Sequence, residues 1–213
     1  MFFLGPLLLF FLILPLLFLL VFFNLATISF ARLGLSPEAA LAFFLASAAG
    51  SVINIPVSRE RVVVPRRVNL PFFLFYYPPT VEERVICVNV GGALLPAALS
   101  LYLLATVSPF LPAVLATAAV ALLAKAMARP VPGVGIAMPA FIPPLLAAAC
   151  ALLLARESPA PVAYISGTMG TLIGADLLNY RIIRRLGAQA VSIGGAGIFD
   201  GIFLVGIVAA FLS

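Results

Sequence analysis

Two aspartates in the last fifth of the chain have the residue type and the setting of a catalytic pair. Asp176 and Asp200 each lie in an apolar segment rich in glycine, and neither has a basic residue within three positions. A carboxylate in hydrocarbon is costly and usually serves a function. Two such carboxylates in contact would share one proton, so that one acts as general base and the other as general acid.

The chain contains no histidine, which narrows the chemistry open to it. Ser-His and Cys-His nucleophiles, histidine metal sites and the HExxH zinc motif are therefore excluded. Lys125 is the only lysine, and its place at a segment end beside Arg129 makes it a poor base for a serine-lysine dyad. If the protein is an enzyme, carboxylates do the work, and we expect neither a metal nor a cofactor.

The composition is that of a membrane protein. Hydrophobic residues make up 64% of the chain and charged residues 9%, with a mean hydropathy of +1.26. A soluble core could not bury so much apolar surface in 213 residues, so membrane lipid is the expected surrounding. The net charge of +5 is spread over connecting segments, which argues against nucleic acid as a partner. Cys87 and Cys150 are too isolated to form a disulfide or metal motif.

Hydropathy and turn residues predict a single all-α transmembrane domain over residues 1–213, with about seven spanning helices. Residues 1–23 lack the basic start and cleavage site of a signal peptide, so we expect them to form the first helix. Ser36, Pro37 and Glu38 have the pattern of a helix start. The predicted spans are 1–23, 36–57, 89–106, a fourth ending near 126, a short fifth ending at 155, and two on either side of the basic turn at 180–185.

Residues 58–86 form the one long polar interval, which we expect to be a cytoplasmic or interfacial loop. Two β-branched pieces of this interval, 61–64 and 84–88, could pair as a small hairpin. A solvated loop is the equal alternative.

A second interruption, residues 129–144, precedes the fifth span and contains five prolines. Such a segment cannot be continuous helix. One interpretation is a broken or re-entrant segment that forms a wall of the site, because irregular backbone at membrane depth needs protein or a wet cavity beside it. The other is a bent linker at the surface.

The distribution of positive charge predicts the topology. The loops after the second, fourth and sixth spans hold ten of the lysines and arginines, whereas the other three loops hold only Arg32 and Arg156. By the positive-inside rule, the amino terminus and the three basic loops lie in the cytoplasm and the carboxyl terminus lies outside.

Three glycine-rich stretches, residues 133–141, 170–176 and 194–201, resemble the signatures of a prokaryotic membrane family called domain of unknown function 1614. The resemblance runs from the second predicted span to the end and implies a place in the prokaryotic inner membrane. That family carries no established activity.

A further resemblance is to the presenilin-type, or GxGD, intramembrane aspartyl proteases. These enzymes use one aspartate on each of two consecutive helices, the second after a glycine-rich turn, with a proline segment nearby. The chain departs from this pattern because residues 197–200 lack the second glycine, no tyrosine precedes the first aspartate, and the proline segment comes before both aspartates. The resemblance implies Asp176 and Asp200 as catalytic residues, with Pro139, Ala140, Phe141, Gly197 and Gly201 in substrate binding.

The two aspartates meet only under one condition. If the whole stretch between them were helical, Asp176 and Asp200 would differ in depth by about 12 Å. They can approach each other if part of residues 187–197 is not helical, which the glycines there permit. On the sixth span, Gly167, Gly170 and Gly174 form one close-packing stripe, and we expect Asp176 to face a different neighbour.

Three functions fit these residues. The first is an intramembrane aspartyl protease that cleaves a transmembrane peptide with the Asp176/Asp200 pair. The second is a proton- or cation-coupled transporter or channel that uses the same carboxylates. The third is a membrane protein without catalytic activity, in which the two acids are protonated and hold the register of the helices.

Overall fold

The structure is a computed structural model that describes residues 4–64, 80–131, 135–139, 141–183, 190–195 and 201–213, and it is mostly helical. Two π-helical turns and one 3₁₀ turn interrupt the regular helices: η1 (Val90–Leu94), η2 (Leu172–Asp176) and η3 (Leu177–Asn179). The α-helices are α1 (Leu4–Arg32), α2 (Pro37–Gly50), α3 (Leu95–Thr106), α4 (Phe110–Met127), α5 (Ile142–Leu154), α6 (Pro159–Thr171), α7 (Tyr180–Ile183) and α8 (Gly201–Leu212).

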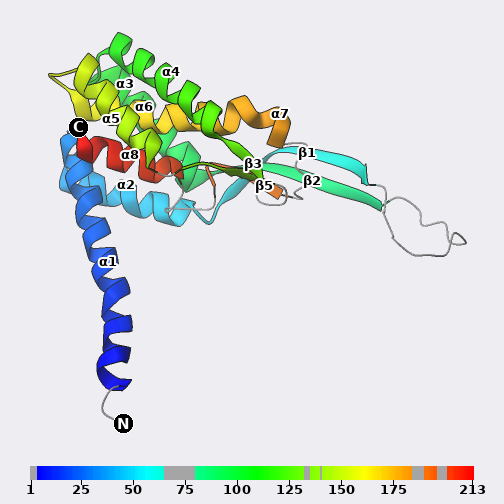
Figure 1. Ribbon diagram of the computed structural model, residues 1–213, viewed down its shortest axis with the longest axis horizontal. Coiled ribbons are helices and arrows are strands. Elements are labelled where there is room, and N and C mark those ends of the chain that lie inside the picture. Colours follow the sequence, from blue (N-terminus) through cyan, green and yellow to red (C-terminus); the bar gives the residue numbers. More distant parts are fainter. Residues whose placement is uncertain (1–3, 65–79, 132–134, 140, 184–189, 196–200) are drawn as a thin grey trace, which may run out of the picture.

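Helix α6 forms the centre of the bundle. It packs against α3, α4, α5 and α8, and nearly all of its residues are buried (Figure 1). The buried residues that α4 and α5 contribute to the core are mostly alanines. Small residues allow helix axes to approach closely, as in membrane helix bundles.

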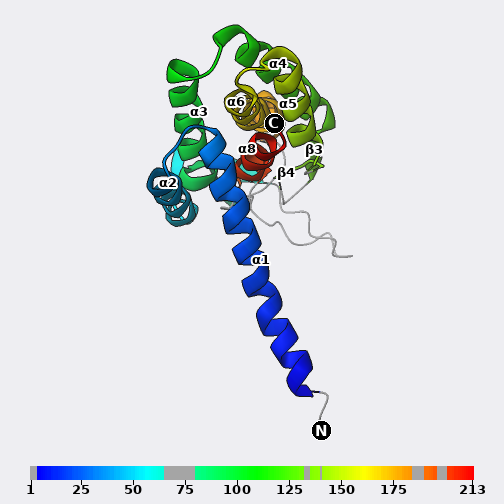
Figure 2. The ribbon, with the colours of Figure 1, turned by 90° about the vertical axis from the view of Figure 1, so that its left-hand side faces the viewer.

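Helix α1 extends beyond this bundle. Figures 1 and 2 show its amino-terminal part projecting away from the other helices, whereas its carboxyl-terminal part packs beside α8. There the Ser29 hydroxyl donates to the Ile207 carbonyl at 3.0 Å, and Arg32 Nη1 donates to the Phe211 carbonyl at 2.6 Å. The first predicted span, 1–23, is therefore too short at its end, because the helix continues to Arg32.

Two described helical stretches are long and apolar enough to cross a membrane, Ile13–Arg32 and Phe110–Met127. The apolar stretches Pro37–Gly50, Val90–Thr106 and Ile142–Leu154 are shorter. The mostly helical fold and the presence of membrane-length helices are thus confirmed, while the full count of seven spans stays a prediction.

The fold is mostly helical, as predicted, but it is not all-α, because the described residues include five strands. β1 (Asn54–Val64) and β2 (Thr80–Asn89) form an antiparallel hairpin that projects from the bundle, and β5 (Ala190–Ile193) pairs with β2 in parallel (Figure 1). Runs of valine, isoleucine and threonine favour this pairing over helix. The prediction of a hairpin is therefore confirmed, but its register differs from the predicted one, because residues 61–64 pair with 80–83 and residues 84–88 pair with 55–60.

The second predicted span, 36–57, starts correctly and ends too late. Ser36 caps α2 as expected, since its hydroxyl accepts from the Ala39 N–H at 3.2 Å. The helix ends at Gly50, whose Cα lies so close to η1 that a Cβ there would come within 3.0 Å of the Gly91 nitrogen. The chain then enters β1, because residues 54–56 pair with β2.

The proline-rich stretch 129–144 is not continuous helix, as predicted. Its β3 (Arg129–Val131) and β4 (Gly135–Ala137) pair in an antiparallel hairpin, and α5 begins only at Ile142. Its predicted role as a wall of the site stays a prediction.

Candidate functional site

Asp176 lies where the sixth helix changes its winding. After Thr171 the helix widens into the π-turn η2, which ends at Asp176, and then tightens into the 3₁₀ turn η3. Such a change releases backbone carbonyls from their regular partners. The buried Asn179 side chain satisfies two of them, since its Nδ2 donates to the Gly174 carbonyl at 3.1 Å and to the Ala175 carbonyl at 3.0 Å. Departures of this kind often mark functional positions in helices.

The carboxylate of Asp176 holds the turn that leads toward Asp200. Asp176 Oδ2 accepts from the backbone N–H of Gly194 at 3.0 Å, and the aspartate is half-buried. Gly194 and Gly195 have φ values of +80° and +64°, a conformation that glycine adopts without strain. A side chain at Gly194 would also collide with Ala93 of η1. The glycine-rich turn is therefore fixed between η1 and the π-turn.

A polar network beside this turn connects the three strands. Asn89 is fully buried, and its Oδ1 accepts from the Gly92 N–H at 2.7 Å and so caps η1. Its Nδ2 donates to the Ser51 carbonyl at 2.7 Å and to Asn54 Oδ1 at 3.1 Å. The Ser192 hydroxyl also donates to Asn54 Oδ1, at 2.6 Å. Ser192 is two residues before Gly194, so this network positions the turn that Asp176 binds.

Sequence analysis assigned no role to Asn89 or Ser192. The signal that could have identified Asn89 is its place two residues before Gly91 and Gly92 at the start of a helical segment, because asparagine is a preferred helix cap. Ser192 carries no comparable signal, since its partner Asn54 lies 138 residues away.

The glycine stripe on α6 is divided between two neighbours. A Cβ at Gly170 or Gly174 would collide with Val120 or with the Ala121 carbonyl of α4, whereas one at Gly167 would meet Val205 and Ala209 of α8. The Asp176 carboxylate accepts from the Gly194 N–H. The expectation that it faces a different neighbour from the glycines is thus confirmed for Gly170 and Gly174.

The structure describes only some of the other predicted site residues. Gly201 is the first residue of α8, Pro139 is exposed, and Phe141 is 76% exposed at the start of α5. Ala140, Gly197 and Asp200 lie outside the described residues, so the distance between the two aspartates stays untested. The condition for their approach is met, because residues 190–195 form a strand and a turn instead of helix.

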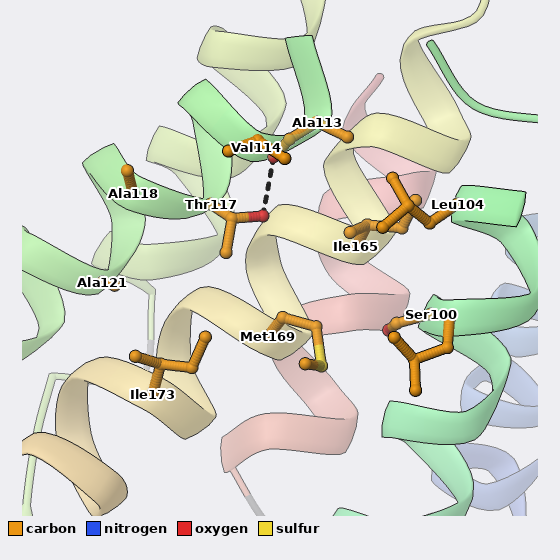
Figure 3. A pocket seen from close by; sticks show the side chains of 11 residues that line it. Ser100, Leu104, Ala113, Val114, Thr117, Ala118, Ala121, Ile165, Met169 and Ile173 are labelled. Atoms are coloured by element: carbon orange, nitrogen blue, oxygen red, sulfur yellow. Dashed lines mark hydrogen bonds between the residues drawn. The ribbon is translucent and has the colours of Figure 1, made fainter. Parts of the chain in front are cut away.

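An apolar pocket of about 290 Å³ lies between α3, α4 and α6 (Figure 3). Its two hydroxyls already have partners, since Ser100 donates to the Pro96 carbonyl at 2.8 Å and Thr117 to the Ala113 carbonyl at 2.7 Å. The lining residues of the sixth helix are Ile165 and Met169 of α6 and Ile173 of η2. This pocket therefore offers apolar surface and no reactive group.

Metal chemistry finds no support among the described residues, where no group of three His, Cys, Asp or Glu side chains could hold an ion. No curated protein and no solved structure matches the chain. A family model does match, over residues 48–212, which covers the hairpin, the π-turns, Asp176 and the glycine-rich turn. The chain belongs to the family described as "Protein of unknown function (DUF1614)".

Proposed function

We propose that the protein is a multi-pass protein of the prokaryotic inner membrane, with seven helical spans, a cytoplasmic amino terminus and an external carboxyl terminus. Two helices of membrane-spanning length, the many apolar side chains exposed around the bundle, and the alternation of charge support this. Single cysteines placed at Arg61 in β1 and at Glu157 before α6, in a background lacking Cys87 and Cys150, test it. Only the cysteine at position 157 should react with a membrane-impermeant maleimide added to intact cells. Labelling at position 61 would overturn the topology.

We further propose that the Asp176/Asp200 pair makes this protein an intramembrane aspartyl protease that cleaves transmembrane peptides. The observation that carries the proposal is the hydrogen bond from the Gly194 N–H to the Asp176 carboxylate. It ties the first aspartate to the glycine-rich turn that leads, six residues later, to the second.

The packing of α8 against α6 adds support. The two helices run antiparallel, because Ser213 after the end of α8 lines the same pocket as Pro159 and Pro161 at the start of α6. At mid-helix, Gly167 faces Val205 and Ala209, and Gly206 faces Tyr164 and Thr168. Continued along the helices, this register brings the start of α8 to the level of Thr171, about 8 Å from Asp176 along the axis. Asp200 directly precedes that start in the sequence.

The chemistry then follows that of a coupled carboxylate pair. One ionised aspartate takes a proton from water, and its neutral partner hydrogen-bonds the scissile carbonyl of the peptide. A protease also needs its substrate in extended form. β5 lies next to the Asp176 turn, and within the described sheet its outer edge carries no further strand, so an unwound peptide could pair there.

Asp176→Asn and Asp200→Asn test this function. The purified protein in liposomes is incubated with single-span peptides, and products are identified by mass spectrometry. Each variant should lose at least ~100-fold in cleavage rate, the usual contribution of a general acid or base. The exposed carboxylate of Glu157, changed to glutamine, is the matched control and should leave the rate unchanged. Cleavage that persists in either aspartate variant would exclude the protease function.

A second candidate is a proton-coupled transporter or channel that uses Asp176. The observation that favours it is a set of buried hydroxyls without hydrogen-bond partners on the same helix. In the third candidate, a purely structural role, Asp176→Asn would change stability without affecting either activity.

A further inference from the structure

Three hydroxyls on one face of α6 lack the partners that buried polar groups require. Tyr164, Thr168 and Thr171 are at least 98% buried, and within the part of the chain that the structure describes none of their side-chain oxygens makes a hydrogen bond. The hydroxyls of Tyr164 and Thr168 lie next to each other, and each has the capacity for a further hydrogen bond. Native proteins rarely leave buried polar atoms unsatisfied, and an unseen water is a common explanation.

The three residues are aligned along the helix. Their spacing of four and three positions places them on one side of α6, and that side faces α8. The facing position of α8 is Gly206, where an added side chain would collide with the Thr168 hydroxyl and come within 2.9 Å of the Tyr164 ring. Glycine thus leaves the hydroxyls opposite backbone and keeps them uncovered by any side chain at this position.

The π-turn continues this line to Asp176. In an uninterrupted α-helix, a residue five positions after Thr171 would be rotated about 140° away from it. The π-turn over Leu172–Asp176 bonds residues five apart, so residues at that spacing come to lie on nearly the same side. The irregular winding therefore brings the Asp176 carboxylate toward the face that carries the three hydroxyls.

The other end of the line reaches a polar pocket. A pocket of about 430 Å³ at the start of α6 is lined by Arg32, Glu157 and Ser158, and also by Pro161, one turn before Tyr164. From Tyr164 to Asp176 the helix rises about 18 Å. A polar pocket, three hydroxyls and a half-buried carboxylate thus follow one another along the longest buried helix.

We propose that Tyr164, Thr168 and Thr171 hold a file of water molecules that conducts protons between the Arg32/Glu157 pocket and Asp176. Each hydroxyl can accept a proton from one water while it passes its own to the next, so no group is changed overall. The Asp176 carboxylate receives the proton and releases it to water on the side of the strands. This activity is separate from peptide cleavage, although both use Asp176.

Proton flux into liposomes tests the proposal. The full chain is reconstituted in phosphatidylethanolamine and phosphatidylglycerol vesicles with a pH-sensitive dye inside, and a potassium diffusion potential drives proton entry. The parent protein should conduct above empty vesicles. Thr168→Val and Thr171→Val, which keep the side-chain shape and remove the hydroxyl, should each lower the flux at least tenfold, and Thr168→Ser should restore it.

Ser166→Ala is the matched control, because Ser166 is also fully buried on α6 but its hydroxyl already donates to the Ala163 carbonyl at 3.3 Å. Its flux should equal that of the parent. Size-exclusion profiles and thermal unfolding confirm that the variants fold, and Tyr164→Phe, which removes a single oxygen, provides an independent test. A parent protein that conducts no more than empty vesicles, or valine variants that conduct like the parent, would overturn the proposal.

Cleavage measured in the same vesicles separates this proposal from the proposed function. Thr168→Val should lose flux and keep cleavage. Conduction without cleavage by the parent protein would reject the protease and retain the proton path. Cleavage without conduction would reject the proton path and retain the protease.

Discussion

Two sides of α6 differ in whether the hydroxyl groups that lie there have hydrogen-bond partners. The side toward α8 carries Tyr164, Thr168 and Thr171, whose hydroxyls have no partner among the described residues. The side toward the α3/α4 pocket carries only apolar side chains, and the pocket's own hydroxyls donate to their helix backbone. A pocket whose polar groups all have hydrogen-bond partners can be filled by hydrocarbon alone. An interface with unsatisfied hydroxyls needs water or another polar group to complete their hydrogen bonds.

A pocket is therefore a poor guide to function in this protein. The α3/α4 pocket is open and easily seen in Figure 3, yet its walls offer no acid, base or unsatisfied donor. The α6/α8 interface carries the hydroxyls without partners and leads toward the half-buried Asp176. The chemically informative region is the one with buried, unpaired polar groups. Burying such groups costs free energy, so they persist only where another interaction compensates.

The largest loss of stability is expected on the side that packs closely against α4, where no space is left for a side chain. Gly174→Ala would drive a Cβ into the Ala121 carbonyl of α4, which is backbone and cannot rotate away. We expect a loss of about 3 kcal/mol in the free energy of unfolding, the upper part of the usual range for overpacking.

Gly167→Ala on the α8 side is the comparison for this prediction. Its Cβ would meet the Val205 side chain at 3.0 Å, which can adjust, so the loss should be about 1 kcal/mol. Reversible unfolding in detergent mixtures measures both variants. Equal losses would show that α4 and α8 yield equally and would contradict the division of the glycine stripe.

The next largest loss of stability is expected in the polar network around Asn89, whose side-chain hydrogen bonds are complete. Asn89→Ala removes the cap of η1 and leaves the Gly92 N–H and the Ser51 carbonyl without their partner. We expect a loss of about 2 kcal/mol in unfolding free energy, because unsatisfied buried groups keep their full desolvation cost.

Asn24→Ala is the matched control, since the exposed Asn24 side chain bonds only its own helix, at the Leu20 carbonyl. Its change should stay within ~0.5 kcal/mol. Thermal unfolding of both variants under one set of conditions gives the comparison. An Asn89→Ala protein as stable as the parent would mean that the network does not hold the Asp176 turn in place.

Some of these features can be predicted from the sequence and others cannot, because only some of them depend on local signals. Asp176 was identified because an acid without a basic neighbour in an apolar segment is costly, and that signal is local. The cap at Ser36 and the interruption at 129–144 are local as well, and both were correct. The β1–β2 hairpin was only one of two alternatives, because strand pairing depends on partners far along the chain.

The π-turn at Leu172–Asp176 was not foreseen. A helical wheel assumes 3.6 residues per turn throughout, and one wider turn rotates every later residue. The wheel placed Asp176 away from the glycine stripe, and the bond from the Gly194 N–H agrees with this for Gly170 and Gly174, which face α4. The line of hydroxyls was not predicted for a related reason, since threonine in an apolar helix usually bonds its own backbone.

The smallest effect is expected in the α3/α4 pocket, and it is the sharpest check of the opening comparison. Thr117→Val removes a hydroxyl that donates only to the Ala113 carbonyl one turn back, and it keeps the volume of the side chain. Unfolding free energy should change by less than ~0.5 kcal/mol, and proton flux should match the parent. Thr168→Val, the same substitution on the α8 side, should lose most of the flux. If Thr117→Val also reduced flux, the pocket would hold water, and the contrast between the two sides of α6 would fail. If neither substitution had an effect, the unsatisfied hydroxyls would be dry, and Asp176 would act without a path along the helix.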